Sequence, residues 1–212
     1  MRTLLQILTD ANAYLDLEAA APTSTELVTR ANYANQAVWD ASAVAQFSEF
    51  HQIYEVCVSN NASVSLPSLF REFVLAPKQQ VSGSWVDFEQ IHPQERFNKE
   101  STDKYCYVVG NPSSGYTAVF NGLTANATIS MDFQRYPSGL LTLTDVCELP
   151  DPTYVTSKVE SYVLESRNND RFPIVKAEAN QKLLNMVGRE AKTPGGGTNT
   201  TPRQGSAAYS IG

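Results

Sequence analysis

The chain has 212 residues, of which 42% are hydrophobic and 18% are charged, so it can bury the core of one large domain or of a compact domain with an inserted module. Its formal net charge is −6, and the absence of any run of basic residues argues against a nucleic-acid-binding surface. No apolar stretch approaches the roughly 18 residues that span a bilayer, and the short apolar start is interrupted at Gln6, so we expect neither a membrane helix nor a signal peptide.

The charge is unevenly distributed along the chain. Residues 1–166 hold 19 acidic and 9 basic residues, a net charge of −10, whereas residues 167–212 hold 3 acidic and 7 basic residues, a net charge of +4. A basic end on an acidic body can pair with a copy of itself or with an acidic partner, although chance variation explains the pattern equally well.

Three cysteines, Cys57, Cys106 and Cys147, occur at spacings that contain no C-x-x-C pair. An odd number of unpaired cysteines is typical of a reducing compartment, so we expect buried thiols and no disulfide framework.

The chain begins with two predicted helices. Residues 3–15 carry an apolar stripe at helical spacing, and Ala21-Pro22 ends that pattern. Thr23 followed by Glu26 is the spacing of a capping box and predicts a second helix that runs to about Phe50. This helix has a narrow seam whose small side chains permit close approach of another helix. The seam consists of Leu27, Ala31, Ala34, Val38, Ala41 and Ala45.

Between Ile53 and Val146 the hydrophobic period changes to two, which predicts antiparallel strands. The candidate strands are 85–88, 105–109, 116–120, 129–133 and 140–143. Asn121-Gly122 tolerates the positive φ angles of a type I′ turn and predicts a hairpin between two of these strands. Residues 69–75 fit either a short helix or another strand.

Helical spacing returns at Asp151-Pro152, where aspartate can accept the first free amides and proline suits the first turn. A last helix is predicted from Pro173, and Gly188 is placed to end or fray it. We therefore expect an α+β fold, in which a helical bundle from the N- and C-terminal helices carries an inserted antiparallel β module, either a sandwich or a barrel. The expected parts are 1–52, 53–150 and 151–190, followed by an extended arm at 191–212.

The arm is rich in glycine, threonine, proline and serine, so it cannot bury enough apolar surface to be held in place alone. We interpret it as a segment that docks on another chain, with Arg203, Tyr209 and Ile211 as contact residues and residues 207–211 suited to strand addition. The alternative is a tail that folds back on its own domain.

No pattern in the sequence predicts catalysis. The two histidines, His51 and His92, are isolated, and the sequence contains no G-x-S-x-G nucleophile elbow to accompany them. It also contains no histidine and cysteine residues at zinc-ligand spacing and no phosphate-binding glycine loop. The acid pair of Asp87 and Glu89 is more typical of solvated strand residues than of a glycosidase or calcium site. We therefore expect no catalytic residue, cofactor or metal.

Four aromatic residues in the strand region allow two interpretations. Tyr105, Tyr107, Tyr116 and Phe120 could form a platform for a sugar, or they could fill the core of the β module, which is the commoner role.

The order of these parts resembles the tailed-bacteriophage head–tail adaptor family, also called phage adaptor or tail tubular protein A-like proteins. The similar stretches are Arg2 to Leu8, Leu66-Pro67-Ser68-Leu69-Phe70, the segment 116–130, Leu141 to Asp145 with Leu149-Pro150-Asp151, and Lys176 to Met186. The resemblance covers about residues 1–190, and the order of the stretches carries it. Residues 76–104 and the tail after Lys192 depart from the commoner pattern of the family.

The resemblance implies a structural protein of the virion, assembled in the host cytoplasm. It implies a homo-oligomeric ring, usually of twelve copies, between the portal protein and the tail or the next connector protein, with genome DNA in transient contact with the lumen and no membrane. The arm at 191–212 would then become ordered on the portal.

Three other functions fit the same residues less well. Another phage tail, baseplate or fibre-attachment protein would share the low charge and differ in ring symmetry. A carbohydrate-binding β module would expose aromatic residues on one strand face. An enzyme such as a cell-wall hydrolase would depend on His51, His92 or Cys106.

Overall fold

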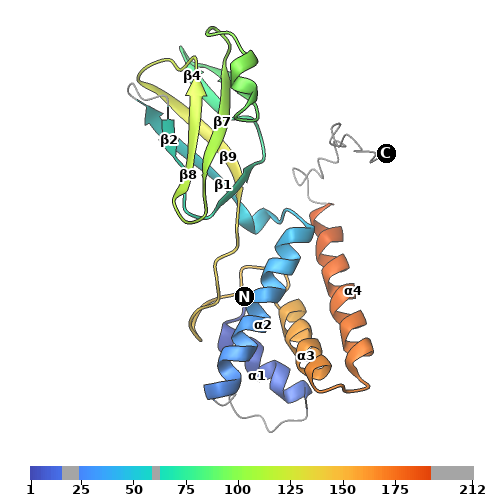
Figure 1. The fold of residues 1–212 in the computed structure, drawn as a ribbon. Helices are drawn as coiled ribbons and strands as arrows, with labels where there is room; N and C mark the ends of the chain where they lie inside the picture. Colours follow the sequence, from blue (N-terminus) through green and yellow to red (C-terminus); the bar gives the residue numbers. More distant parts are fainter. Residues whose placement is uncertain (16–23, 59–62, 192–212) are drawn as a thin grey trace, which may run out of the picture.

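The computed structural model describes residues 1–15, 24–58 and 63–191, which form four α helices and two mainly antiparallel sheets (Figure 1). The fold is therefore mixed α+β, as predicted. The helices are α1 (Leu4–Tyr14), α2 (Ser24–Val44), α3 (Thr153–Ser166) and α4 (Phe172–Glu190), with short 3₁₀ turns η1 (Ser48–Phe50) and η2 (Glu95–Asn98).

Helix α1 begins where the sequence predicts it, and its first turn is closed by a reciprocal cap. The Thr3 hydroxyl accepts a hydrogen bond from the Gln6 amide at 3.3 Å, and the Thr3 amide donates to the Gln6 side chain at 3.0 Å. Two amides that the helix cannot satisfy itself are thereby paired. The capping box predicted at Thr23 lies outside the described residues.

Helix α2 ends at Val44, so the prediction that it continues to Phe50 was wrong. The chain leaves the helix because Phe47 and Phe50 are both buried, in an edge-to-face contact with ring centroids 6.2 Å apart. The Phe47 carbonyl accepts a hydrogen bond from the buried Gln134 side chain at 3.0 Å, which directs the chain into the first strand. Tertiary packing therefore outweighs the helix propensity of Ala45.

Helices α3 and α4 begin within one residue of the prolines that the sequence indicates, Pro152 and Pro173. Asp151 Oδ1 accepts hydrogen bonds from the amide and hydroxyl of Thr153, the first residue of α3. Pro173 lies in the first turn of α4. The predicted end of α4 at Gly188 was wrong, because the helix continues to Glu190; a side chain at Gly188 would meet open space.

The four helices share one hydrophobic cluster, together with residues of the segment that leads into α3. The buried members are Leu4, Ile7, Leu8, Ala11, Ala34, Ala37, Val38, Ala41, Phe47, Phe50, Leu140, Cys147, Leu149, Tyr154, Val155, Val159, Ala179 and Met186. The strand predicted at 140–143 is absent from this described segment, so that prediction was wrong. Residues 140–149, which the sequence assigned to the β region, instead pack on the helices.

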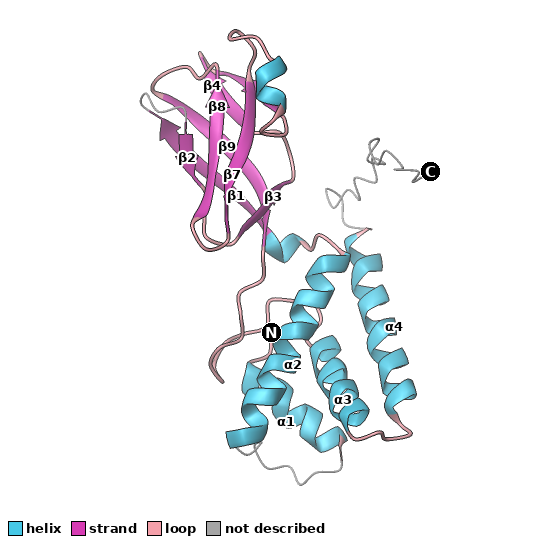
Figure 2. Cartoon of the chain, viewed as in Figure 1, coloured by secondary structure: helices cyan, strands magenta, loops and turns pink. Residues whose placement is uncertain are grey.

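The strands form two sheets (Figure 2). Their bounds are β1 His51–Val58, β2 Ser63–Ser65, β3 Phe70–Phe73, β4 Lys78–Val81, β5 Ser84–Asp87, β6 Glu89–Gln90, β7 Tyr105–Asn111, β8 Gly115–Asn121 and β9 Ala127–Arg135. One sheet has the order β1-β9-β4-β5, with β3 also paired to β9, and the other has the order β2-β8-β7-β6. The ambiguous residues 69–75 therefore contain a strand. All pairs are antiparallel except β6 with β7.

Residues of both sheets form a second hydrophobic cluster. Its buried members are Val58, Val64, Leu66, Phe70, Phe73, Phe88, Cys106, Ala118, Phe120, Ile129, Met131 and Phe133. The predicted alternation of β9 is confirmed, because Ile129, Met131 and Phe133 all point into this cluster.

The hairpin predicted at Asn121-Gly122 was wrong. Strand β8 pairs with β7 and β2, whereas β9 belongs to the other sheet, so the chain crosses between sheets after Asn121. The Asn121 amide group donates hydrogen bonds to the Ser101 and Asp103 carbonyls at 3.1 and 2.7 Å, which holds it against a different turn. The positive φ pair of a tight turn occurs instead at Ser82-Gly83, between β4 and β5.

A set of polar contacts joins the strand region to the helical region. Arg71 of β3 donates to the Ser42 carbonyl at 2.7 Å, and Arg135 at the end of β9 forms a bidentate ion pair with Glu148 at 2.8 and 3.1 Å. Burial alone would raise the pKa of Glu148, but hydrogen bonds from Arg135 and Ser138 outweigh it and hold the pKa below its ordinary value. Trp39 and Tyr136 pack with ring centroids 5.1 Å apart at the same joint.

The buried alternation of β9 generates a stability prediction. We expect Phe133→Ala to lower the free energy of unfolding by about 3–5 kcal/mol, because the substitution leaves a cavity between the sheets. Ile53→Ala on the adjacent β1, where the side chain is 66% exposed, should change it by less than about 0.5 kcal/mol. Urea denaturation of both variants measures the difference, and equal losses would contradict the assigned core.

Candidate interaction surface

The α2 seam predicted from the sequence faces the interior of this chain. Ala34, Val38 and Ala41 are buried in the helical cluster, and Leu27, Ala31 and Ala45 are partly buried against it. Helix α2 there packs on α3 and, over a smaller area, on α1. The other predicted contact residues, Arg203, Tyr209 and Ile211, lie outside the described residues.

The two histidines lie apart and in unlike settings. His51 pairs through Nε2 with Asp132 on the neighbouring strand. The His92 ring accepts a hydrogen bond from the Gln94 amide at 3.3 Å, within a turn. Within residues 1–15, 24–58 and 63–191, no three acidic, histidine or cysteine side chains gather in the way that a metal ion needs.

The cysteines differ from one another in exposure. Cys106 and Cys147 are buried, and burial raises the pKa of Cys106 to about 12 and that of Cys147 to about 11. Both are therefore protonated at neutral pH and poor nucleophiles. Cys57 is exposed on β1, so the expectation of buried thiols was wrong for this residue.

The four aromatic residues of the strand region divide between two faces. Phe120 is buried and Tyr116 packs against the same cluster, as expected for core residues. Tyr105 and Tyr107 lie on the outer face of β7, with nearly parallel rings 6.4 Å apart. Alternate positions on a strand point to opposite faces, which explains this division.

A small set of exposed apolar residues lies beside the start of α1. We call it the apolar patch; it consists of Leu5, Leu141, Leu143 and Val146. Leu141 is the most exposed member at 86%. Its neighbour Leu140 is buried in the helical cluster, so the loop presents one leucine to solvent and anchors the other.

Side-chain hydrogen bonds fix the loop that carries this patch. Asn35 of α2 accepts from the Leu140 amide at 2.7 Å and donates to the Leu140 carbonyl at 3.0 Å. Asp145 accepts from the amides of Leu141 and Thr142 at 2.6 and 2.7 Å and from the Thr142 hydroxyl at 2.7 Å. The loop has no regular secondary structure, yet most of its polar backbone is paired.

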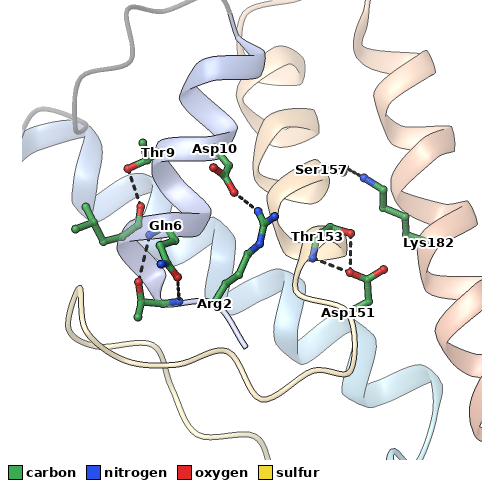
Figure 3. Close-up of polar contacts among 10 residues, drawn as sticks. Arg2, Gln6, Thr9, Asp10, Asp151, Thr153, Ser157 and Lys182 are labelled. Carbon is green, nitrogen blue, oxygen red and sulfur yellow. Dashed lines mark hydrogen bonds and ion pairs between the residues drawn. The ribbon is translucent and has the colours of Figure 1, made fainter.

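The chain start lies along the same loop. Thr3 and Val146 form an antiparallel bridge, the Leu4 amide donates to the Asp145 carbonyl at 2.8 Å, and the Leu5 amide donates to the Leu143 carbonyl at 3.0 Å. Arg2 forms an ion pair with Asp10, which lies farther along α1. Figure 3 shows the Arg2–Asp10 ion pair and the Gln6 contacts at the start of α1, with the hydrogen bonds between Asp151 and Thr153 at the start of α3.

This arrangement suits docking. An exposed leucine on a mobile loop would lose conformational entropy on binding, whereas here the backbone is already held in one conformation. Preorganised apolar residues of this kind commonly mark interaction sites. The sequence prediction missed the patch because Leu140 to Leu143 reads as a strand; the Thr142/Asp145 spacing was the available signal for a side-chain-capped turn.

No protein-family model matches this chain, and no curated protein matches it. In the described part of the chain, no helix is both long enough and apolar enough to cross a membrane. The function must therefore be argued from the chain's own residues.

The Asp145 hydrogen bonds generate a pH prediction. Donation by the Thr142 side chain, and then by the Thr142 and Leu141 amides, holds the pKa of Asp145 below its ordinary value of about 3.9. These bonds stabilise the folded loop at neutral pH, and the contribution is lost as the pH falls through the lowered pKa. An NMR titration of the Asp145 carboxyl group should show this depression, and Thr142→Val should reduce it.

Thr144→Val is the matched control, because the Thr144 hydroxyl contacts only that of Thr142, at 3.0 Å. An ordinary pKa for Asp145 in the unmodified protein, or equal shifts in both variants, would show that the loop is not held in this way.

Thiol labelling tests the cysteine environments. At pH 7.5 we expect one equivalent of a thiol reagent to react rapidly with the folded protein, at Cys57, and three to react after denaturation. Mass spectrometry of the labelled peptides identifies the site. Rapid labelling of Cys106 would disprove its burial.

Proposed function

We propose that this chain is a structural head–tail connector, or adaptor, of a tailed bacteriophage, which forms a ring between the portal protein and the tail through which DNA passes. In this proposal the protein carries out no catalysis, and its mechanism is assembly. The resemblance of the sequence to the adaptor family supplies the starting point, and the organisation of the fold supports it.

One observation carries the proposal. Helices from the two ends of the chain share a single hydrophobic cluster, while the strands encoded between them enclose a separate one. We interpret this organisation as a helical bundle with an inserted β module, which is the order of parts that the adaptor resemblance implies. In an adaptor the helical bundle would contact neighbouring copies and the β module would project outward or toward the tail.

Charge and surface agree with this role. The net charge of −6 suits a channel that must let DNA pass, because a basic wall would bind its phosphates. The preorganised apolar patch suits a protein that is buried among neighbours in its working state. The partners proposed are further copies, the portal protein, and the tail or the next connector protein.

We also propose that the arm at 191–212, of which residues 192–212 lie outside the described residues, docks on the portal through Arg203, Tyr209 and Ile211. Its composition favours order only against another surface.

A carbohydrate-binding module is the second candidate, and one observation favours it. Tyr105 and Tyr107 lie on an outer strand face, and Phe97 of the neighbouring η2 turn is 77% exposed. However, the Arg96 guanidinium lies over the Phe97 and Tyr107 rings at 4.7 and 5.6 Å from their centroids, and it covers part of that surface. Glycan-array binding that is lost in Tyr107→Ala would favour this candidate.

Electron microscopy of purified particles tests the adaptor proposal. We expect antibody or gold label on this chain at the head–tail junction, and a twelve-fold ring on the particle axis. A chain lacking residues 191–212 should fold, with an unchanged circular dichroism spectrum, and fail to join the portal. Label on the baseplate or fibres, or three- or six-fold symmetry, would identify a different tail component. Completed particles made with the truncated chain would disprove the role of the arm alone.

A further inference from the structure

Helix α4 is attached to the rest of the chain along one narrow stripe. It packs mainly on α3, and only Val175, Ala179 and Met186 of its 19 residues are buried. A surface helix of a globular protein typically buries one face and exposes charged residues on the other. The exposed side of α4 departs from that pattern.

The outer face of α4, opposite the buried stripe, carries no charge. Its eight positions are all exposed, and they are Pro173, Ile174, Ala177, Asn180, Gln181, Leu184, Asn185 and Gly188. Ile174 and Leu184 are 71% and 63% exposed. Ile174, Ala177, Gln181, Leu184 and Gly188 follow alternating steps of three and four, which is the spacing of a helix–helix seam. Charge depletion with apolar anchors is typical of the centre of a protein interface.

Gly188 supports the same interpretation. A glycine inside a helix is unfavourable compared with alanine, and a side chain at this position would meet nothing within 4 Å in the chain. The fold of one copy therefore does not require glycine here. Together with Ala177, it leaves a flat stretch on which another chain can approach closely.

The apolar patch lies on the opposite side of the helical region. Figure 1 shows the loop that contains the patch on one side of α2 and α4 on the other side, with α3 between the two helices. Two different apolar surfaces on opposite sides cannot meet within one copy. When a second copy is related to the first by a rotation, the outer face of α4 of one copy can contact the apolar patch of the other. If repeating that rotation returns to the first copy, the contact generates a closed ring.

The charges of the two sides are complementary. Residues 167–191 hold five basic and three acidic residues, a net charge of +2. Residues 136–152 hold three acidic residues and no basic residue, a net charge of −3, and one of the three, Glu148, is already paired with Arg135. In the part of the chain that the structure describes, the Asp145 carboxylate accepts hydrogen bonds only from uncharged groups of Leu141 and Thr142. Lys176 lies over the Phe172 ring on α4, and no carboxylate contacts it within the described ranges.

We propose that the outer face of α4 docks on the apolar patch of a second copy of this chain, in a heterologous contact that repeats around the ring. The proposal rests on the proposed adaptor function, to which it adds the two contact surfaces. Leu184 and Ile174 provide the apolar anchors on one side and Leu141 on the other, and the complementary charges set the orientation.

Two charge substitutions test the contact, because each disables one surface and leaves the other intact. Leu141→Glu disrupts the apolar patch and Leu184→Glu disrupts the outer face of α4. Phe97→Glu is the matched control, since Phe97 is equally exposed but lies on the β region. All three side chains are on the surface, so unchanged circular dichroism and melting temperature should establish that the variants fold.

Sedimentation velocity over a concentration series gives the readout. We expect the unmodified chain and Phe97→Glu to associate as concentration rises, and each of the other variants to associate at least about tenfold more weakly. An equimolar mixture of Leu141→Glu and Leu184→Glu should form a one-to-one dimer and stop there, because only one intact pair of surfaces remains.

Three results would overturn the inference. They are a monomer at every concentration for the unmodified chain, unaltered association of both variants, and dimers formed by Leu141→Glu alone, which would indicate α4 packing on α4. Microscopy of particles separates this inference from the adaptor proposal. If particles have an axial ring that incorporates both variants normally, the docking contact is wrong and the adaptor function is retained. If the chain self-associates as expected but lies off the particle axis, the adaptor function is wrong and the docking contact is retained.

Discussion

The contact between Arg135 and Glu148 is the interaction on which the arrangement of the two regions depends. It joins the last strand to the segment that re-enters the helices, and its bidentate geometry fixes direction as well as distance. Gln134, the neighbouring residue, holds the outgoing chain at Phe47. The chain passes between the two regions twice, once from α2 into β1 and once from β9 toward α3. Adjacent residues of β9, Gln134 and Arg135, hold these two connections. Because Arg135 is largely buried, loss of Glu148 would leave an unpaired cation in the joint.

The sequence predicted secondary structure correctly where one face of an element is buried and the apolar residues therefore recur at regular spacing. The alternation of Ile129, Met131 and Phe133 and the helical spacing of residues 3–15 each reflect a local rule, and the structure follows both. The prediction failed where distant residues decide. Helix α2 stops because Phe47 packs against Phe50 and bonds with Gln134, and Asn121 is drawn to the 101–103 turn and not into a hairpin. No local window contains those partners.

The apolar patch could not be predicted from the local sequence either. Leu141 lies in a run of leucines that is typical of a strand, and only the contacts of Asn35 and Asp145 hold that run in a loop that exposes Leu141 and Leu143. Asn35 is 105 residues away from Leu140. The two surfaces proposed to meet between copies could be found only from the fold, because the exposure of a residue depends on which side of each element is covered.

The register of β1 against β9 also bears on the order in which the protein folds. His51 lies opposite Gln134, so pairing of these strands places the end of α2 beside the start of the segment that leads to α3. The N-terminal and C-terminal helices would otherwise have to meet across the whole strand region, at a considerable cost in loop-closure entropy. Pairing of these strands before the helices meet would remove most of that cost. In that order of events, slow folding of the strands would delay the helices as well.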